Sequence, residues 1–223
     1  MKKLAVIAMS VFCAILLCGC QKEEYSKTAP ALPPVESIKI DLSSFNTPTK
    51  ADCRNEYFAY VVDHILNNWQ NIFEQLINIP IEGFEQFVKI TPVQKSNGAW
   101  LWQCEVKDGF TTYTVSLVGR EKRDAVEWEL SVSSEGLITV KNFVWLTGES
   151  SKDGREGEWR VVSGPTDIIS PTDVAVESHW ECDVNRVITK VELTYKLDHC
   201  FVCLNPFQND SRITYMRSAP SEE

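Results

Sequence analysis

Apolar and polar side chains alternate along most of the chain after residue 99. Alternation with a period of two is typical of a strand that buries one face and leaves the other in water. This pattern predicts that the second half of the chain forms a sheet. The clearest stretch places Val126, Trp128, Leu130 and Val132 on one side, and Glu127, Glu129, Ser131 and Ser133 on the other.

Short turns separate further alternating segments. Lys107-Asp108-Gly109 is a hairpin signal, because glycine takes the positive φ angle that a tight turn demands. A second turn is expected from Asp183 to Arg186. The alternating segments between about residues 99 and 217 predict about eight or nine antiparallel strands. Such strands favour a curved meander that curls over its apolar face, as a half-barrel or a flattened barrel.

A different period occupies the region from about Asn55 to Ile77. Its apolar residues recur at intervals of three and four, which predicts a long amphipathic helix. Asp52 is a suitable N-cap, and Pro80 is expected to end the helix. An apolar stripe this wide needs a large partner surface, so we expect the helix to pack into the curved sheet. The predicted fold class is therefore α+β, mainly antiparallel β, with one long N-terminal helix.

The chain starts with a basic and then an apolar segment. Lys2 and Lys3 precede an apolar run from Leu4 to Leu17. The run is about 14 residues long, or roughly 21 Å as a helix, which is too short to cross a hydrocarbon core of about 30 Å. A basic start followed by a short apolar run is typical of a secretory signal peptide.

The signal peptide is followed by a cysteine in a recognisable context. Leu17-Cys18-Gly19-Cys20 resembles the lipobox of bacterial lipoproteins. The resemblance implies cleavage after Gly19 and attachment of fatty-acid chains such as palmitate to Cys20. Stable membrane attachment takes two lipid signals, and three chains on one cysteine exceed that requirement. We therefore expect a lipid anchor at Cys20.

The four residues after the expected anchor are also informative. Gln21-Lys22-Glu23-Glu24 is similar to the short surface-export signal of Bacteroidota lipoproteins. The similarity implies display on the outer face of the outer membrane. The alternative location is the periplasmic leaflet.

The predicted organisation has three parts. Residues 1–19 form the signal peptide, residues 20–34 form the lipidated N-terminus and a proline-rich flexible tether, and residues 35–223 form one globular domain. Within the domain, Val35 to Leu42 alternates and predicts a short half-buried edge strand.

The charge of the chain restricts its partners. It has 22 basic and 31 acidic residues, a formal net charge of −9. Loss of residues 1–19 removes two lysines and no acid, which leaves 20 basic residues, 31 acidic residues and a net charge of −11. Nucleic acid is excluded as a partner, because a phosphate backbone needs a surplus of Lys and Arg. An anionic membrane would also repel the body, so the lipid must hold it there.

Six of the seven tryptophans lie in the strand region. Because Trp100, Trp102, Trp128 and Trp180 alternate with the apolar set, we expect them to fill the core. If any tryptophan binds a ligand, we expect it to be Trp145 or Trp159. These two flank a polar loop expected from Glu149 to Gly157, and loops carry binding more often than sheet faces do.

Four residues near the C-terminus are of types that bind metals. Cys200 and Cys203 have the spacing of a zinc knuckle, and His179 and Cys182 could complete a tetrahedral site. Residues three apart on a strand point to opposite faces, however, so both halves of the site would need turns. We therefore expect no metal and no other cofactor.

The body contains an odd number of cysteines, so at least one thiol stays free. The others either form one or two disulfides or behave as small apolar residues. The five are Cys53, Cys104, Cys182, Cys200 and Cys203.

The sequence lacks the common catalytic motifs, namely a Gly-x-Ser-x-Gly elbow, a phosphate loop, His-Glu-x-x-His and Gly-x-Gly-x-x-Gly. Carboxylates such as Glu127 with Glu129, or Asp153 with Glu156 and Glu158, leave a glycosidase pair open.

We expect a non-enzymatic envelope lipoprotein that binds an apolar ligand, a glycan or a partner protein. The alternatives are a structural or interaction module without a pocket and a weak glycan hydrolase. A cavity of a few hundred Å³ over the apolar face of the sheet would favour the binding protein over the structural module.

Overall fold

The computed structural model describes residues 26–39, 77–135, 139–162, 174–196 and 212–216. Within these ranges nine strands form one sheet. Each strand pairs antiparallel with the next strand along the chain, so the strand order is the sequence order. The strands are β1 (Val93–Gln94), β2 (Trp100–Asp108), β3 (Thr111–Glu121), β4 (Ala125–Glu135), β5 (Val140–Ser151), β6 (Glu156–Val162), β7 (Val174–Cys182), β8 (Ile188–Tyr195) and β9 (Arg212–Met216).

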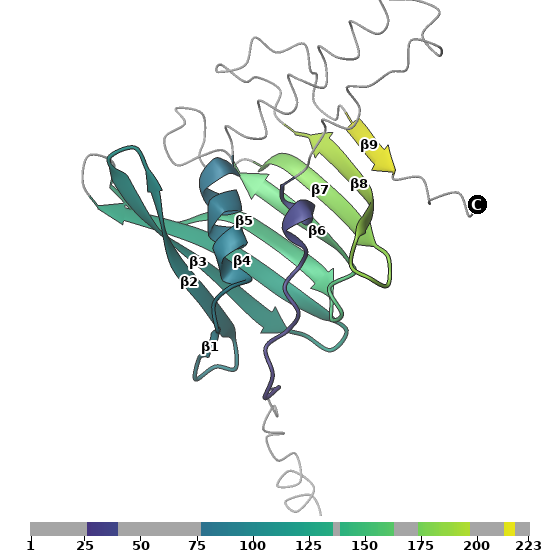
Figure 1. The fold of residues 1–223 in the computed structure, drawn as a ribbon, viewed down its shortest axis with the longest axis horizontal. Coiled ribbons are helices and arrows are strands. Elements are labelled where there is room, and N and C mark those ends of the chain that lie inside the picture. Colours follow the sequence, from purple (N-terminus) through teal and green to yellow (C-terminus); the bar gives the residue numbers. More distant parts are fainter. Residues whose placement is uncertain (1–25, 40–76, 136–138, 163–173, 197–211, 217–223) are drawn as a thin grey trace, which may run out of the picture.

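The predicted antiparallel meander is confirmed. The sheet is curved and open, with β1 and β9 at its two edges (Figure 1). Along β4 the buried residues are the predicted set, from Val126 to Val132 in steps of two, and the residues between them are half-buried. We call the side that carries this buried set the inner face and the opposite side the outer face.

A helix covers residues 77–87 and lies against the inner face (Figure 1). Its buried residues include Ile77, Phe84 and Phe87, which belong to the core. The helix expected from residue 55 to residue 77 falls, except for its last residue, outside the described ranges. The expectation that Pro80 ends a helix is wrong, because Pro80 lies within this one. Burial of Phe84 and Phe87 against the sheet favours continuation of the helix beyond this proline.

Residues 26–39, which we call the strap, also lie on the inner face (Figure 1). The strap contains the 3₁₀ helix η1 (Val35–Ser37), so the prediction of a strand is wrong there. The reason lies in Ser37, which belongs to the polar side of the alternating segment but is buried. Its hydroxyl donates to the Pro34 carbonyl at 2.7 Å and accepts a hydrogen bond from Trp159 Nε1 at 3.0 Å.

The part of the expected tether that the structure describes packs on the body. Pro33 is buried, and Ala29 and Leu32 pack against the core. At the start of the strap, the Gln94 side chain donates to the Ser26 carbonyl at 2.8 Å. The proline-rich stretch of residues 29–34 is therefore part of the folded body.

Three tryptophans of the inner face lie over glycines on the neighbouring strand. In each pair, a Cβ atom on the glycine would come within 2.5 to 2.7 Å of the indole ring. Such an approach is far inside van der Waals contact, so each ring needs a residue without a side chain beside it. The pairs are Gly119 with Trp128, Gly148 with Trp159 and Gly157 with Trp180.

Trp159 contacts all three parts of the described body. Its ring lies over Gly148 of β5, and its indole N–H donates to Ser37 of the strap. The helix contributes Phe84, whose ring meets Trp159 edge-on with a centroid separation of 6.0 Å. The side chain is 1% exposed. Sheet, helix and strap thus meet at one residue.

We predict that Gly148→Ala lowers the free energy of unfolding by about 1 to 3 kcal/mol, because the new methyl group would meet the Trp159 ring and the Glu158 carbonyl. Urea denaturation followed by tryptophan fluorescence measures the change. The control is Thr147→Ala at the exposed neighbouring position. Equal stabilities of the two variants would contradict this account of Gly148.

Candidate functional site

The outer face carries a row of titratable side chains across five neighbouring strands. In each strand pair the members of this row stand directly opposite one another. Like charges that face each other across two strands are destabilising, so a row of this kind is not what stability alone would select. The acidic row consists of Glu127, Glu149, Glu158, His179 and Glu192.

Basic side chains compensate part of the acidic row. Glu158, for example, lies between Arg160 Nη2 at 2.8 Å and His179 Nδ1 at 3.7 Å. Glu127 pairs with Lys122, and Glu192 pairs with Arg212 at 3.2 Å. For Glu149 the described residues supply no ion pair.

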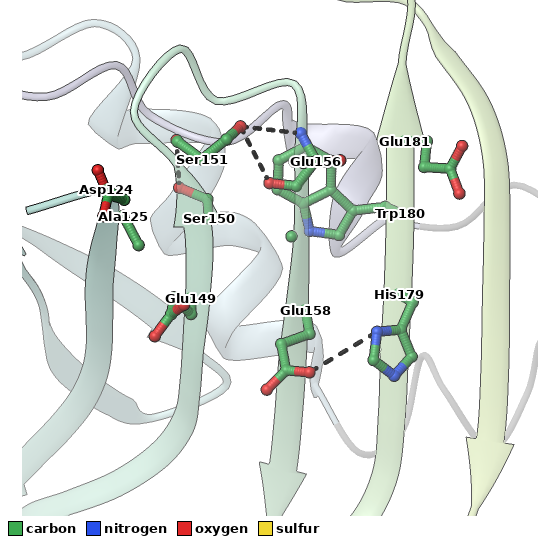
Figure 2. A pocket seen from close by; sticks show the side chains of 11 residues that line it. Asp124, Ala125, Glu149, Ser150, Ser151, Glu156, Glu158, His179, Trp180 and Glu181 are labelled. Atoms are coloured by element: carbon green, nitrogen blue, oxygen red, sulfur yellow. Dashed lines mark hydrogen bonds and ion pairs between the residues drawn. The ribbon is translucent and has the colours of Figure 1, made fainter.

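One part of the outer face is hollowed around the acidic row (Figure 2). This acidic hollow has a volume of about 480 Å³ and opens widely to solvent. Five carboxylates and one imidazole line it, together with serine hydroxyls. The lining residues are Asp124, Ala125, Glu149, Ser150, Ser151, Glu156, Gly157, Glu158, His179, Trp180 and Glu181.

The chemistry of the acidic hollow suits a polar ligand. Carboxylates accept hydrogen bonds from hydroxyl groups or attract cations, and His179 adds a group that can donate. Among the described residues, no three His, Cys, Asp or Glu side chains are grouped so that they could hold a metal ion. The hollow thus offers hydrogen-bond acceptors for a hydroxyl-rich or cationic ligand.

The two described residues that were considered for a metal site, His179 and Cys182, do not form one. His179 is exposed on the outer face, whereas Cys182 packs against the core from the same strand. Cys200 and Cys203 lie outside the described residues.

The two tryptophans considered for ligand binding are both buried. Trp145 is 6% exposed and Trp159 is 1% exposed. The polar loop is also shorter than expected, because β5 extends to Ser151 and β6 begins at Glu156. Of the four tryptophans expected in the core, Trp102, Trp128 and Trp180 are buried, and Trp100 is half-buried.

An apolar groove lies between the strap and the end of the helix. This strap groove has a volume of about 410 Å³ and is open to solvent. Four prolines and Phe87 present rings without a hydrogen-bonding group, and Trp102 of β2 contributes a ring that is 2% exposed. The lining residues are Ala29, Pro30, Leu32, Pro33, Pro34, Val35, Phe87, Val88, Ile90, Pro92, Trp102 and Arg186.

Sequence reasoning missed the strap groove because its walls come from three distant parts of the chain. The prolines were assigned to a tether, and residues 87–92 follow a helix that was expected to end at Pro80. One signal could have pointed to the groove, namely the apolar residues Ala31, Leu32 and Val35 among the prolines. Such residues are unusual in a solvated spacer.

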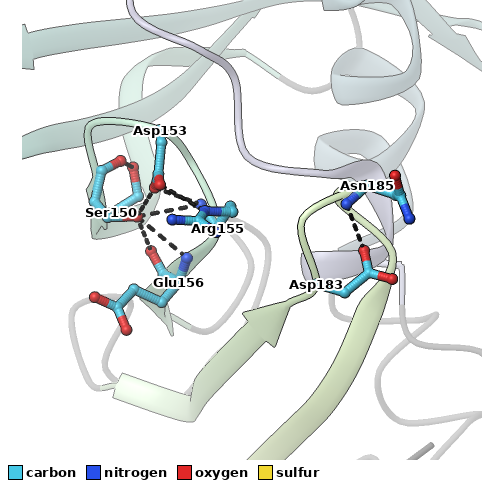
Figure 3. A network of polar contacts seen from close by, with 7 residues as sticks. Ser150, Asp153, Arg155, Glu156, Asp183 and Asn185 are labelled. Atoms are coloured by element: carbon cyan, nitrogen blue, oxygen red, sulfur yellow. Dashed lines mark hydrogen bonds and ion pairs between the residues drawn. The ribbon is translucent and has the colours of Figure 1, made fainter. Parts of the chain in front are cut away.

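Two turns meet the strap near the groove (Figure 3). In the β5–β6 turn, hydrogen bonds from Ser151 and Arg155 lower the pKa of Asp153 to about 2. Gly154 of this turn comes so close to Arg186 of the β7–β8 turn that a Cβ atom would lie 2.8 Å from the guanidinium. The same Cβ atom would lie 3.4 Å from the carbonyls of Ala31 and Leu32, so this turn lies against the strap as well.

The two described cysteines are free thiols. Burial raises the pKa of Cys104 and the pKa of Cys182 to about 11. Their sulfur atoms stay protonated at neutral pH, which suits small apolar residues rather than nucleophiles or metal ligands. Cys53, Cys200 and Cys203 lie outside the described ranges.

The described helices are all too short or too polar to pass through a bilayer. No family model matches the chain, and neither a curated protein nor a solved structure is significantly similar to it.

We predict that Glu149→Gln raises the free energy of unfolding by about 0.5 kcal/mol at low salt, because it removes one of the facing like charges. The gain should vanish at 1 M salt, where the Debye length is about 3 Å. Glu127→Gln is the matched control, since it also loses the ion pair with Lys122. Thermal or urea denaturation of both variants at two salt concentrations tests this, and a loss of stability in Glu149→Gln would contradict it.

Proposed function

We propose that the protein is a lipid-anchored protein of the cell envelope whose body binds an apolar ligand in the strap groove and catalyses no reaction. The anchor is the lipid expected at Cys20. The export signal expected at residues 21–24 would place the body on the outer surface of the outer membrane.

The strap groove is the observation that carries this proposal. Its volume of about 410 Å³ falls in the range of small-molecule sites, which is about 300 to 1,000 Å³. Its lining of prolines, aliphatic residues and aromatic rings favours an apolar ligand. A purely structural module would have no use for an open apolar groove, because its exposed surface lowers solubility.

The position of the strap supports a link between the groove and the membrane. The strap begins at Ser26, six residues after Cys20. Six residues span at most about 20 Å, so a lipid on Cys20 holds the start of the strap within that distance of the bilayer. Ala29 and Pro30, which line the groove, follow three and four residues after Ser26. An apolar ligand could then pass between bilayer and groove over a short path.

The acidic hollow favours a second candidate, a glycan-binding surface. Its carboxylates could accept hydrogen bonds from sugar hydroxyls, and its serines could also donate hydrogen bonds to them. Its open shape suits a polysaccharide chain. A hydrolase would use two of the same carboxylates as acid and base.

We predict that Cys20→Ala abolishes the lipid label and moves the protein out of the membrane fraction. Cys18→Ala is the matched control, because it keeps a small residue before Gly19 and should be labelled normally. Metabolic labelling with an alkyne fatty acid and membrane fractionation measure both effects. A Cys20→Ala protein that still matures and stays membrane-bound would exclude the proposed anchor.

We predict that the mature polypeptide without its lipid, residues 21–223, binds the neutral dye N-phenyl-1-naphthylamine and that decanol displaces it. Val88→Glu should weaken dye binding about tenfold, because Val88 lines the groove and is 55% exposed, so that a charge there opposes an apolar ligand.

The control for this experiment is Val144→Glu, at a position 38% exposed on β5. Fluorescence titration measures the affinities. Equal binding by the two variants would exclude the groove as the site. If the dye does not bind and a soluble polysaccharide binds the wild type but not Glu158→Gln, the glycan-binding candidate replaces the first.

A further inference from the structure

We infer that the ligand of the strap groove is a fatty acid, and that Arg186 binds its carboxylate. This inference rests on the proposed function and names the class of ligand. Arg186 is the one charged residue among the described residues that line this otherwise apolar groove.

Arg186 differs from the other arginines that the structure describes. Five of the six described arginines lie within ion-pair distance of a carboxylate, although the protein carries a net charge of −9. Arg186 has no such partner among the described residues. A guanidinium without a carboxylate in an acidic protein is available for an anionic ligand.

The β7–β8 turn fixes where Arg186 points. The Asp183 carboxylate accepts the backbone N–H groups of Asn185 and Val187, each at 2.9 Å (Figure 3). Arg186 sits between them with a positive φ of 64°, and its own N–H donates to the Asp183 carbonyl. Asp183, the acidic residue nearest to Arg186 in the sequence, thus binds backbone N–H groups and forms no ion pair with the guanidinium.

From this turn the Arg186 side chain reaches the strap. Its Nη2 donates to the carbonyl of Leu32, a residue that lines the groove. A guanidinium has five N–H donors, and this hydrogen bond uses one of them. Two of the others can bind both oxygens of a carboxylate in parallel, which is the preferred geometry of the pair.

The remaining lining selects the rest of the ligand. The prolines of the strap and the side chains of Phe87, Ile90 and Trp102 offer contacts to methylene groups and no charge. A volume of about 410 Å³ and a single cation suit one alkyl chain with one negative charge. A neutral alcohol of the same length would fill the groove but leave the guanidinium without an anion.

The test compares decanoate with decanol, both below the concentration at which they form micelles, as competitors of N-phenyl-1-naphthylamine on residues 21–223. Decanoate should bind the wild type at least about tenfold more tightly than decanol. Arg186→Met should remove this preference and leave the affinity for decanol unchanged. Arg160→Met, which removes an ion-paired arginine, is the control and should keep the preference.

A second pair of variants tests the charge without changing Arg186. Val88→Lys should tighten and Val88→Glu should weaken decanoate binding relative to the wild type. If Arg186→Met also loses affinity for decanol because the strap has moved, the two Val88 variants decide whether a positive charge favours decanoate. Equal decanoate affinity in the two Val88 variants, or an Arg186→Met protein that still prefers decanoate, overturns the inference.

The outcomes also separate the inference from the proposed function. Binding of decanol and decanoate with equal affinity refutes the role of Arg186 and leaves an apolar ligand in the groove. Absence of binding by both refutes the inference and the proposed function together.

Discussion

The packing of Trp159 holds the described body together. Its indole ring can lie flat on β5 because Gly148 offers no side chain, and its edge then reaches Phe84 of the helix. The hydrogen bond from its N–H to Ser37 holds the strap on the same face. This hydrogen bond satisfies a buried donor and ties the path of the strap to the position of Trp159. The strap groove exists because the strap follows that path.

The two faces of the sheet differ in the forces that act on them. The inner face is covered by helix and strap, and its energy comes from burial of large aromatic rings in close contact. The outer face is held by the backbone ladder and by exposed ion pairs, and it carries facing carboxylates that cost stability. One face therefore offers an apolar groove with one cation, and the other offers an open surface of acceptors. These are different kinds of ligand site.

The sequence predicted the sheet well because strand signals are local. The alternation from Val126 to Val132 and the turn after Asp183 depend on neighbouring residues, and both correspond to observed elements. The burial of Trp145 and Trp159 was harder to predict, because it depends on residues of other strands and, for Trp159, on Gly148. The strap groove could not be predicted, because it joins residue 32, residue 87 and residue 186 through tertiary contacts only. Local sequence patterns carry no information on contacts between residues so far apart in the chain.

The separation along the chain between the strap and its partners has a consequence for how the molecule forms. The strands pair with their sequence neighbours, so the sheet can grow hairpin by hairpin with little loop-closure entropy at each step. The strap is synthesised before its partners, yet it binds a tryptophan 122 residues later and an arginine 154 residues later. It can reach its place only after the sheet has been synthesised as far as the β7–β8 turn. A ligand that requires the groove can therefore bind only to finished molecules, never to nascent ones.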